Sequence, residues 1–180
     1  MKQIFLALVA VAMLGITTSA HANTFGVKFN PITILIGYVD VDIDIAITNN
    51  IVITPSFQSW NFEFGDFDYE IQGVGGSISY HFSGALQDSF YLGGSFRSLS
   101  LTLDDEFTGE TAEADVTASG VILGYQWVWD SFYMNLGAFA GSASESEIDV
   151  EDSSGNLTGE TEDVPATLGV GLDFKLGWSF

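Results

Sequence analysis

The sequence contains no cysteine and has few basic residues, four lysines and arginines among 180 residues. Without cysteine, the chain can form neither a disulfide bond nor a thiolate metal site, and it has no thiol nucleophile. The few basic residues face 24 acidic ones, and the formal net charge is −20. Such an acidic chain repels nucleic acid. We therefore expect no DNA or RNA partner.

Long apolar runs are also missing beyond the N-terminus. Lys2 precedes an apolar run from Ile4 to Ile16, and a small-x-small pattern follows at Ala20-His21-Ala22. This pattern is typical of a secretory signal peptide, so we expect residues 1–22 to be removed and residues 23–180 to form one domain. No later stretch has the roughly 18 continuous apolar residues of a membrane-spanning helix.

Apolar residues are nevertheless abundant, at 47% of the chain, which argues against a disordered protein. The last nine residues show how they are arranged, because large apolar residues there alternate with small or polar ones. The apolar set is Leu172, Phe174, Leu176, Trp178 and Phe180. Asp173 and Lys175 share the opposite face. A period of two predicts a strand with one apolar and one polar face.

The same alternation recurs along the chain. It predicts strands at residues 38–47, 51–62, 71–82, 89–103, 116–129, 132–143 and 165–180. An even count requires one more strand, for which residues 24–36 are the remaining candidate. The apolar phase changes between Phe96 and Leu99, so we expect a β-bulge near Ser98.

The connections between these strands fall into two classes. Short turns lie near Asn49, Gly84 and Asp130, and long acidic loops lie at residues 63–70, 104–115 and 144–164. The two classes alternate strictly, as in outer-membrane barrels with short periplasmic turns and long outer loops. Carboxylates at this density would bind divalent cations weakly, although solvated acidic loops are the simpler expectation.

Taken together, the chain resembles the small eight-stranded bacterial outer-membrane barrels of the OmpA-like and OmpX-like class. The resemblance rests on Phe180, on the outward aromatic residues of the last strands and on the alternation of turns and loops. It implies an all-β, antiparallel, up-and-down transmembrane β-barrel in the outer membrane. It also implies contacts with outer-membrane lipid and lipopolysaccharide, and recognition of the terminal strand by periplasmic chaperones and the barrel-assembly machinery.

Polar residues on the inward phase form the candidate functional set. By parity the set holds Asp40, Asp42, Asp44, Gln58, His81, Arg97, Gln126, Asn135, Asp173 and Lys175. A barrel of eight strands is filled by its own side chains, so the simplest interpretation is a network that rigidifies the interior. We therefore expect a structural or surface-interaction protein with no catalysis, no cofactor and no metal. The alternative is a narrow, cation-preferring pore.

One short motif suggests an enzyme. His81-Phe82-Ser83 resembles the His-x-Ser motif of outer-membrane lipid A deacylases, in which the histidine acts as base and the serine as nucleophile. Gly84 stands where that family has asparagine, and no acidic residue follows on the same strand. The orientation of the strands also places Ser83 in a periplasmic turn, away from the outer leaflet. A lipid A-modifying hydrolase is therefore the third hypothesis.

Overall fold

The computed structural model describes residues 24–65, 67–105, 107, 110–144, 146–151, 157–164 and 166–180. The expected signal peptide at residues 1–22 lies outside this range. The described chain is almost entirely β-structure. No helix in the described part is long and apolar enough to cross a membrane.

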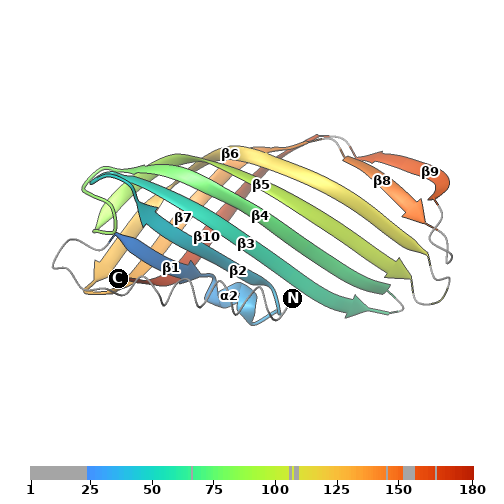
Figure 1. Cartoon of the computed structure of the whole chain (residues 1–180), viewed down its shortest axis with the longest axis horizontal. Coiled ribbons are helices and arrows are strands. Elements are labelled where there is room, and N and C mark those ends of the chain that lie inside the picture. Colours follow the sequence, from blue (N-terminus) through green and yellow to red (C-terminus); the bar gives the residue numbers. More distant parts are fainter. Residues whose placement is uncertain are drawn as a thin grey trace.

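Eight antiparallel strands close into a barrel (Figure 1). They are β1 (Phe25–Phe29), β2 (Val39–Ala46), β3 (Ile51–Phe64), β4 (Phe67–His81), β5 (Ser89–Asp105), β6 (Thr111–Trp129), β7 (Phe132–Ala143) and β10 (Thr167–Ser179). The order is β5-β4-β3-β2-β1-β10-β7-β6, and pairing of β5 with β6 closes the ring. The predicted eight-stranded barrel is therefore confirmed.

The first strand differs from the prediction. Instead of one strand over residues 24–36, β1 ends at Phe29, and a short helix, α2 (Pro31–Ile34), follows. Asn30 caps this helix, because its Oδ1 accepts hydrogen bonds from the backbone N–H groups of Ile32 (3.0 Å) and Thr33 (3.3 Å). Proline at the first helical position loses no hydrogen bond there. Local capping therefore overrides strand propensity at this point.

The predicted long loops also differ. β3 and β4 remain paired up to Phe64 and Phe67, and β5 and β6 up to Asp104 and Thr111, so most of residues 63–70 and 104–115 lies in strands. Much of residues 144–164 forms a hairpin of β8 (Ser146–Glu151) and β9 (Leu157–Val164), which extends the sheet from β6. Along β8, Glu147, Asp149 and Glu151 alternate with Ile148 and Val150, and this alternation suits a strand.

The barrel therefore has two different ends. The end that carries the turns 47–50, 82–88 and 130–131 is called the short-turn end. The opposite end, to which β3, β4, β5 and β6 extend, is called the hairpin end. The half of the barrel next to each end takes the same name. The C-terminus lies at the short-turn end (Figure 1).

The expected β-bulge near Ser98 is absent. The register of β5 is continuous with β4, from His81–Tyr91 to Phe67–Asp105, and continuous with β6. The change of apolar phase therefore has another cause: towards the hairpin end, the inward residues of β5 become apolar and the outward ones become polar. No shift of the backbone is needed.

This inversion of polarity extends across four strands. Its inward members form what we call the apolar inner face: Trp60, Phe62, Tyr69, Ile71, Leu99, Leu101, Leu103 and Val116. At the same level the outward residues include Asn61, Glu63, Asp68, Glu70, Ser100, Asp104 and Asp115. Nearer the short-turn end the pattern is the opposite, with polar residues inside and exposed apolar residues outside.

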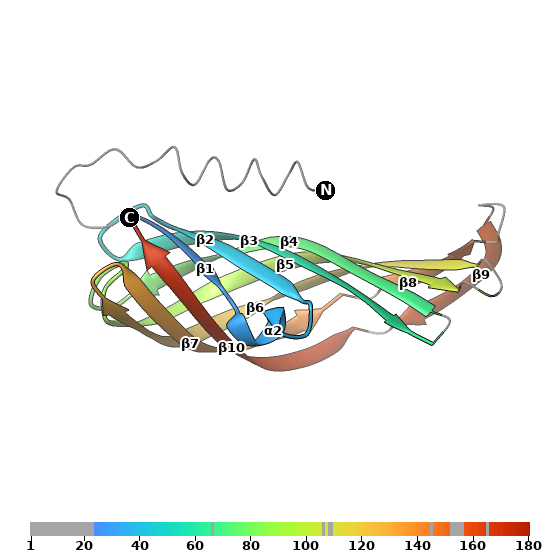
Figure 2. The same ribbon diagram turned by 90° about the horizontal axis from the view of Figure 1, so that it is seen from below.

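A seam in the wall separates β3 from β10 in the hairpin half. β1 pairs with β10 from Leu176 to Ser179, so among the described strands β10 has no ladder partner on that side from Leu168 to Lys175. Similarly, β2 pairs with β3 only as far as Ser59, so the rest of β3 has no ladder partner on that side among the described strands. Helix α2 contacts both β2 and β10 at this seam, as Figure 2 shows from below. The barrel is closed by strand pairing in its short-turn half.

Candidate functional site

The polar residues singled out from the sequence lie together inside the short-turn half. Most of them are buried: Asp40, Asp42, Asp44, Gln58, His81, Gln126, Asn135 and Lys175. Arg97 and Asp173 are half-buried, and both line an interior cavity that is described below. All three carboxylates of β2 therefore point inward, as the apolar alternation of Val39, Val41 and Ile43 requires.

Lys175 connects β10 to β2 through two carboxylates. Its side chain is buried, and its Nζ lies 3.0 Å from Asp40 Oδ1 and 2.7 Å from Asp42 Oδ2. A buried ammonium of this kind is tolerated because carboxylates compensate the charge. The pairs cross the short β1 strand, so they tie the barrel together where strand pairing is least extensive.

Asp44 forms the second centre of the network. It accepts hydrogen bonds from Lys28 Nζ (2.7 Å) and Thr54 Oγ1 (2.6 Å) on Oδ1, and from Tyr133 Oη (2.8 Å) on Oδ2. These donors come from β1, β3 and β7. A single carboxylate therefore joins strands on both sides of the barrel interior.

Several of these residues were not in the set expected from the sequence: Lys28, Thr54, Ser79, Ser89, Tyr91 and Tyr133. The signal for Lys28 was the alternation of Phe25, Val27 and Phe29 with Gly26 and Lys28. It was hidden because residues 24–36 were interpreted as one irregular strand. Tyr91 and Tyr133 are aromatic, and aromatic residues occur on either face of such strands. Their residue type therefore does not show that they point inward, and only their positions in the alternation of β5 and β7 do.

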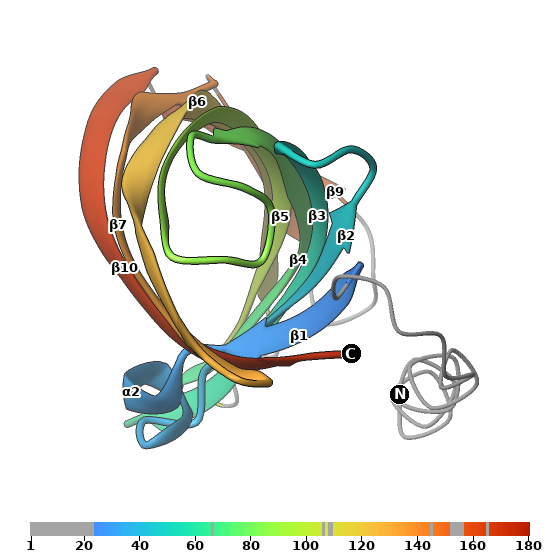
Figure 3. The same cartoon turned by 90° about the vertical axis from the view of Figure 1, so that its left-hand side faces the viewer.

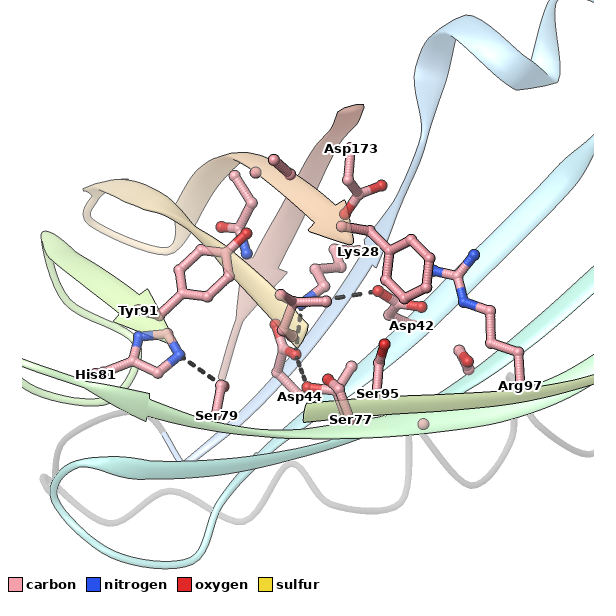
Figure 4. Close-up of a pocket in the computed structure, with 18 residues that line it drawn as sticks. Lys28, Asp42, Asp44, Ser77, Ser79, His81, Tyr91, Ser95, Arg97 and Asp173 are labelled. Atoms are coloured by element: carbon pink, nitrogen blue, oxygen red, sulfur yellow. Dashed lines mark hydrogen bonds and ion pairs between the residues drawn. The ribbon is translucent and has the colours of Figure 1, made fainter. Parts of the chain in front are cut away.

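A cavity of about 60 Å³ opens between these side chains (Figure 4). Its lining includes Asp42, His81, Asn135, Arg97 and Asp173. Figure 4 shows His81 and Tyr91 at one end and Arg97 at the other. Polar atoms of the first three residues have no hydrogen-bond partner, namely Asp42 Oδ1, His81 Nδ1 and Asn135 Oδ1. A polar space of this size suits a few water molecules, which would satisfy such atoms.

The described part of the chain contains no assembled metal site. No group of three or more histidine, aspartate or glutamate side chains has a metal-binding arrangement there. The carboxylates of β2, Asp40, Asp42 and Asp44, instead form ion pairs with Lys28 and Lys175. The acidic segment 144–164, for which the sequence suggested weak binding of divalent cations, lies partly outside the described residues.

The turn between β4 and β5, residues 82–88, crosses the mouth of the barrel at the short-turn end (Figure 3). We call it the plug turn. Ala85 and Leu86 are buried, at 7% and 4% exposure. Ala85 N donates to Asn49 O (2.7 Å) on one side, and Val128 N donates to Asp88 Oδ1 (2.6 Å) on the other. The plug turn is thus hydrogen-bonded to the rim on two sides, and it narrows the opening at this end.

The His81 and Ser83 pair is not assembled as a catalytic dyad. His81 Nε2 lies 3.2 Å from Ser79 Oγ, two residues earlier on the same strand. Ser83 is exposed in the plug turn, and its backbone N–H donates to Ser89 Oγ. His81 Nδ1 has no partner, so no carboxylate orients the ring. The chemistry that the motif suggested would need an acid on Nδ1 and a serine on Nε2.

The terminal strand has the alternation expected of it. Leu172, Trp178 and Phe180 are exposed on the outward face, at 88%, 44% and 53%, and Phe174 and Leu176 are half-buried beside them. Trp178 contacts the rings of Phe29 and Phe132, at centroid distances of 6.1 and 5.4 Å.

Comparisons of the chain with protein-family models, with curated proteins and with solved structures give no match. The functional argument therefore rests on the geometry of the barrel itself.

Proposed function

We propose that this chain is an integral protein of the bacterial outer membrane with a structural or surface-interaction role and no catalytic activity. In this proposal the barrel crosses the membrane with the short-turn end in the periplasm. Outer-membrane lipid and lipopolysaccharide surround its wall, and periplasmic chaperones and the barrel-assembly machinery recognise its terminal strand.

The observation that carries the proposal is the belt of exposed apolar side chains around the short-turn half. It includes Ile78, Tyr80, Phe90, Leu92, Phe96, Val121, Leu123, Trp129 and Leu136, which are 48–65% exposed. A belt this large is rare on a water-soluble surface. From Val121 to Trp129 it extends about 26 Å along β6, or about 20 Å along the axis of a barrel whose strands tilt by roughly 40°, close to the apolar band of outer-membrane barrels.

Three features favour a structural role. Ion pairs occupy much of the interior of the short-turn half, the plug turn narrows the short-turn end, and the strands of the hairpin end carry acidic residues outward. Such an acidic outer surface would attract basic partners or divalent cations at the cell surface. The cavity beside Asp42 and Asp44 keeps the cation-preferring pore as the second candidate.

Two experiments test the membrane assignment. Boiled and unboiled samples of the purified, folded protein should migrate differently on a gel. Fractionation of cells that express the protein should place it with the outer membrane. In planar bilayers we expect no discrete conductance steps. Cation-selective steps that disappear in the Asp42→Asn variant would replace the structural role by the pore, and an unshifted band together with a soluble fraction would overturn the membrane assignment.

A further inference from the structure

The apolar inner face is an uncovered surface. None of its eight members belongs to the buried apolar core of the described residues, which consists of Val52, Ala85, Leu86, Tyr91 and Tyr133. Its residues instead stand half-buried in rows across neighbouring strands. One row joins Trp60, Ile71 and Leu101, and the next joins Phe62, Tyr69 and Leu103. An uncovered apolar surface of this kind is typical of binding sites.

The aromatic side chains of this face are pre-arranged. The rings of Phe62 and Tyr69 are stacked at 4.6 Å with an interplanar angle of 3°, and Trp60 lies 4.3 Å from Phe62. Trp60 Nε1 also donates to Ile36 O (3.0 Å), just beyond α2. The ring of Tyr38 packs edge-on against Trp60 at a centroid distance of 6.0 Å, so the aromatic contacts extend from β4 through β3 to the start of β2.

The seam gives this face a route to the outside of the barrel. In the hairpin half, β3 and β10 are not joined by a strand, and α2 lies at the gap. Exposed apolar residues lie at α2 and on the β10 side of the seam: Ile32 and Leu35 are 60% and 85% exposed, and Leu168 and Val170 are 87% and 88% exposed. An apolar chain that leaves through the seam would therefore meet apolar side chains on the outer wall at α2 and β10.

A cationic group stands where the apolar inner face meets the polar cavity. Arg97 precedes Leu99 on the inward face of β5 and lines the cavity. Of the three basic residues in the described chain, Lys28 and Lys175 form ion pairs with aspartates, whereas no ion pair involves Arg97. A guanidinium in this position offers a fork of donors that matches a carboxylate.

We propose that this surface binds a long-chain fatty acid, with its carboxylate on Arg97 and its hydrocarbon chain along Leu99, Leu101 and Leu103. The seven residues from Arg97 to Leu103 cover about 20 Å of strand, the length scale of an extended long-chain fatty acid. Trp60 and Phe62 flank the chain, and the seam lets the acid enter or leave sideways. This inference goes beyond the proposed structural role and does not depend on it.

Charge complementarity selects the head group. The outward acidic residues of the hairpin half would repel polyanionic lipids, whereas one carboxylate requires one cation, and Arg97 supplies it. Asp173 also lines the cavity and has no ion pair of its own in the described structure. Its negative charge in the same cavity would repel the carboxylate of the ligand. Removing the Asp173 charge should therefore strengthen binding of the acid.

Trp60 provides a local reporter for the test. The other tryptophans, Trp127, Trp129 and Trp178, lie near the short-turn end, so changing them to phenylalanine leaves Trp60 as the single fluorophore. The protein is placed in nanodiscs and titrated with a long-chain fatty acid brominated near its methyl end, which quenches nearby tryptophan. We expect saturable quenching that the unbrominated acid reverses by competition.

The head-group assignment is tested with Arg97→Gln, Arg97→Lys and the matched brominated alcohol. Loss of a charge-assisted pair should weaken the acid about tenfold or more in Arg97→Gln. Arg97→Lys keeps the charge but loses the fork of donors, so its affinity for the acid should lie between those of wild type and Arg97→Gln. Asp173→Asn should increase the affinity, and the alcohol should bind wild type and Arg97→Gln equally. Leu101→Asn should weaken both the acid and the alcohol, because it interrupts the apolar inner face.

The folding of every variant is checked by its heat-modifiable gel shift. Quenching that never saturates, or that the unbrominated acid does not reverse, would overturn the proposal. So would equal affinities of wild type and Arg97→Gln for the acid. If Arg97→Gln does not fold, an unchanged affinity in Asp173→Asn would overturn the head-group assignment. None of these results bears on whether the barrel resides in the outer membrane, which fractionation decides separately.

Discussion

The two halves of this barrel use one backbone pattern for opposite chemistry. In the short-turn half most inward residues are charged or polar, and ion pairs and hydrogen bonds join the central ones, as at Lys175 and Asp44. In the hairpin half the inward residues are apolar, while Glu70 and Asp115 face outward. The register runs through both halves of β4 and β5 without interruption. The alternation thus fixes which residues share a face, and the environment of each face decides its polarity.

The comparison also separates two sources of stability. The polar interior depends on a few strong contacts between buried charges, so losing one partner leaves another unpaired. The apolar inner face depends on many weak contacts between half-buried side chains. Substitutions should therefore have large effects in the first region and small effects in the second.

The largest effect is expected for Lys175→Met. The change keeps the length of the side chain but leaves Asp40 without its buried cation and Asp42 with only Lys28, whose Nζ lies 3.8 Å from Asp42 Oδ2. Breaking one side of a buried ion pair costs about 3–5 kcal/mol. We expect a loss of this size in the free energy of unfolding, measured by urea titration of the folded barrel in nanodiscs or detergent.

A control tests whether the loss comes from uncompensated charge. In the double variant Lys175→Met with Asp40→Asn, the carboxylate that lost its cation is neutral, so part of the stability should return. Leu101→Ala, in the other half, should cost about 1 kcal/mol because the side chain is already partly exposed. Equal losses in Lys175→Met and Leu101→Ala would remove the contrast between the halves.

An intermediate effect is expected for Tyr133→Phe. The change removes the hydrogen bond from Tyr133 Oη to Asp44 Oδ2 and leaves the donors Lys28 and Thr54 in place. A hydrogen bond to a charged group contributes about 1.5–3 kcal/mol. The unfolding free energy should fall by an amount within this range, and by less than for Lys175→Met. Thr54→Val, which removes a donor from the other oxygen, is the matched variant.

Much of the barrel could be predicted because alternation is a local property of the sequence. The inward placement of Asp40, Asp42 and Asp44 follows from the apolar residues between them, and parity then requires an eighth strand. The position of Lys28 could not be predicted in the same way. Residues 24–36 combine a strand and a helix, and the capping of that helix by Asn30 interrupts the pattern after five residues.

The apolar inner face was missed for a different reason. Sequence reasoning assumed that apolar residues always point outward, so the phase change at Leu99 was interpreted as a β-bulge. The paired strands show that the face stays the same while its chemistry changes. Acidic residues at 104–115 were assigned to loops on the same assumption. A change in the phase of the apolar alternation can mark either a β-bulge or the level at which the inward face changes from polar to apolar. Only the strand register distinguishes the two.

The smallest effect provides the finest test of that register. Asp115 and Val116 are neighbours on β6, with Asp115 exposed and accepting a hydrogen bond from Ser100, and Val116 half-buried opposite Leu99. If alternation continues through the hairpin half, Asp115→Asn should change the unfolding free energy by less than about 0.5 kcal/mol. Val116→Asn should cost roughly 1 kcal/mol, since it places an amide in an apolar row. The two variants introduce the same side chain at adjacent positions, so the difference in their urea midpoints reports the facing of each residue. Equal midpoints, or a reversed order, would mean that β6 does not hold its register in the hairpin half.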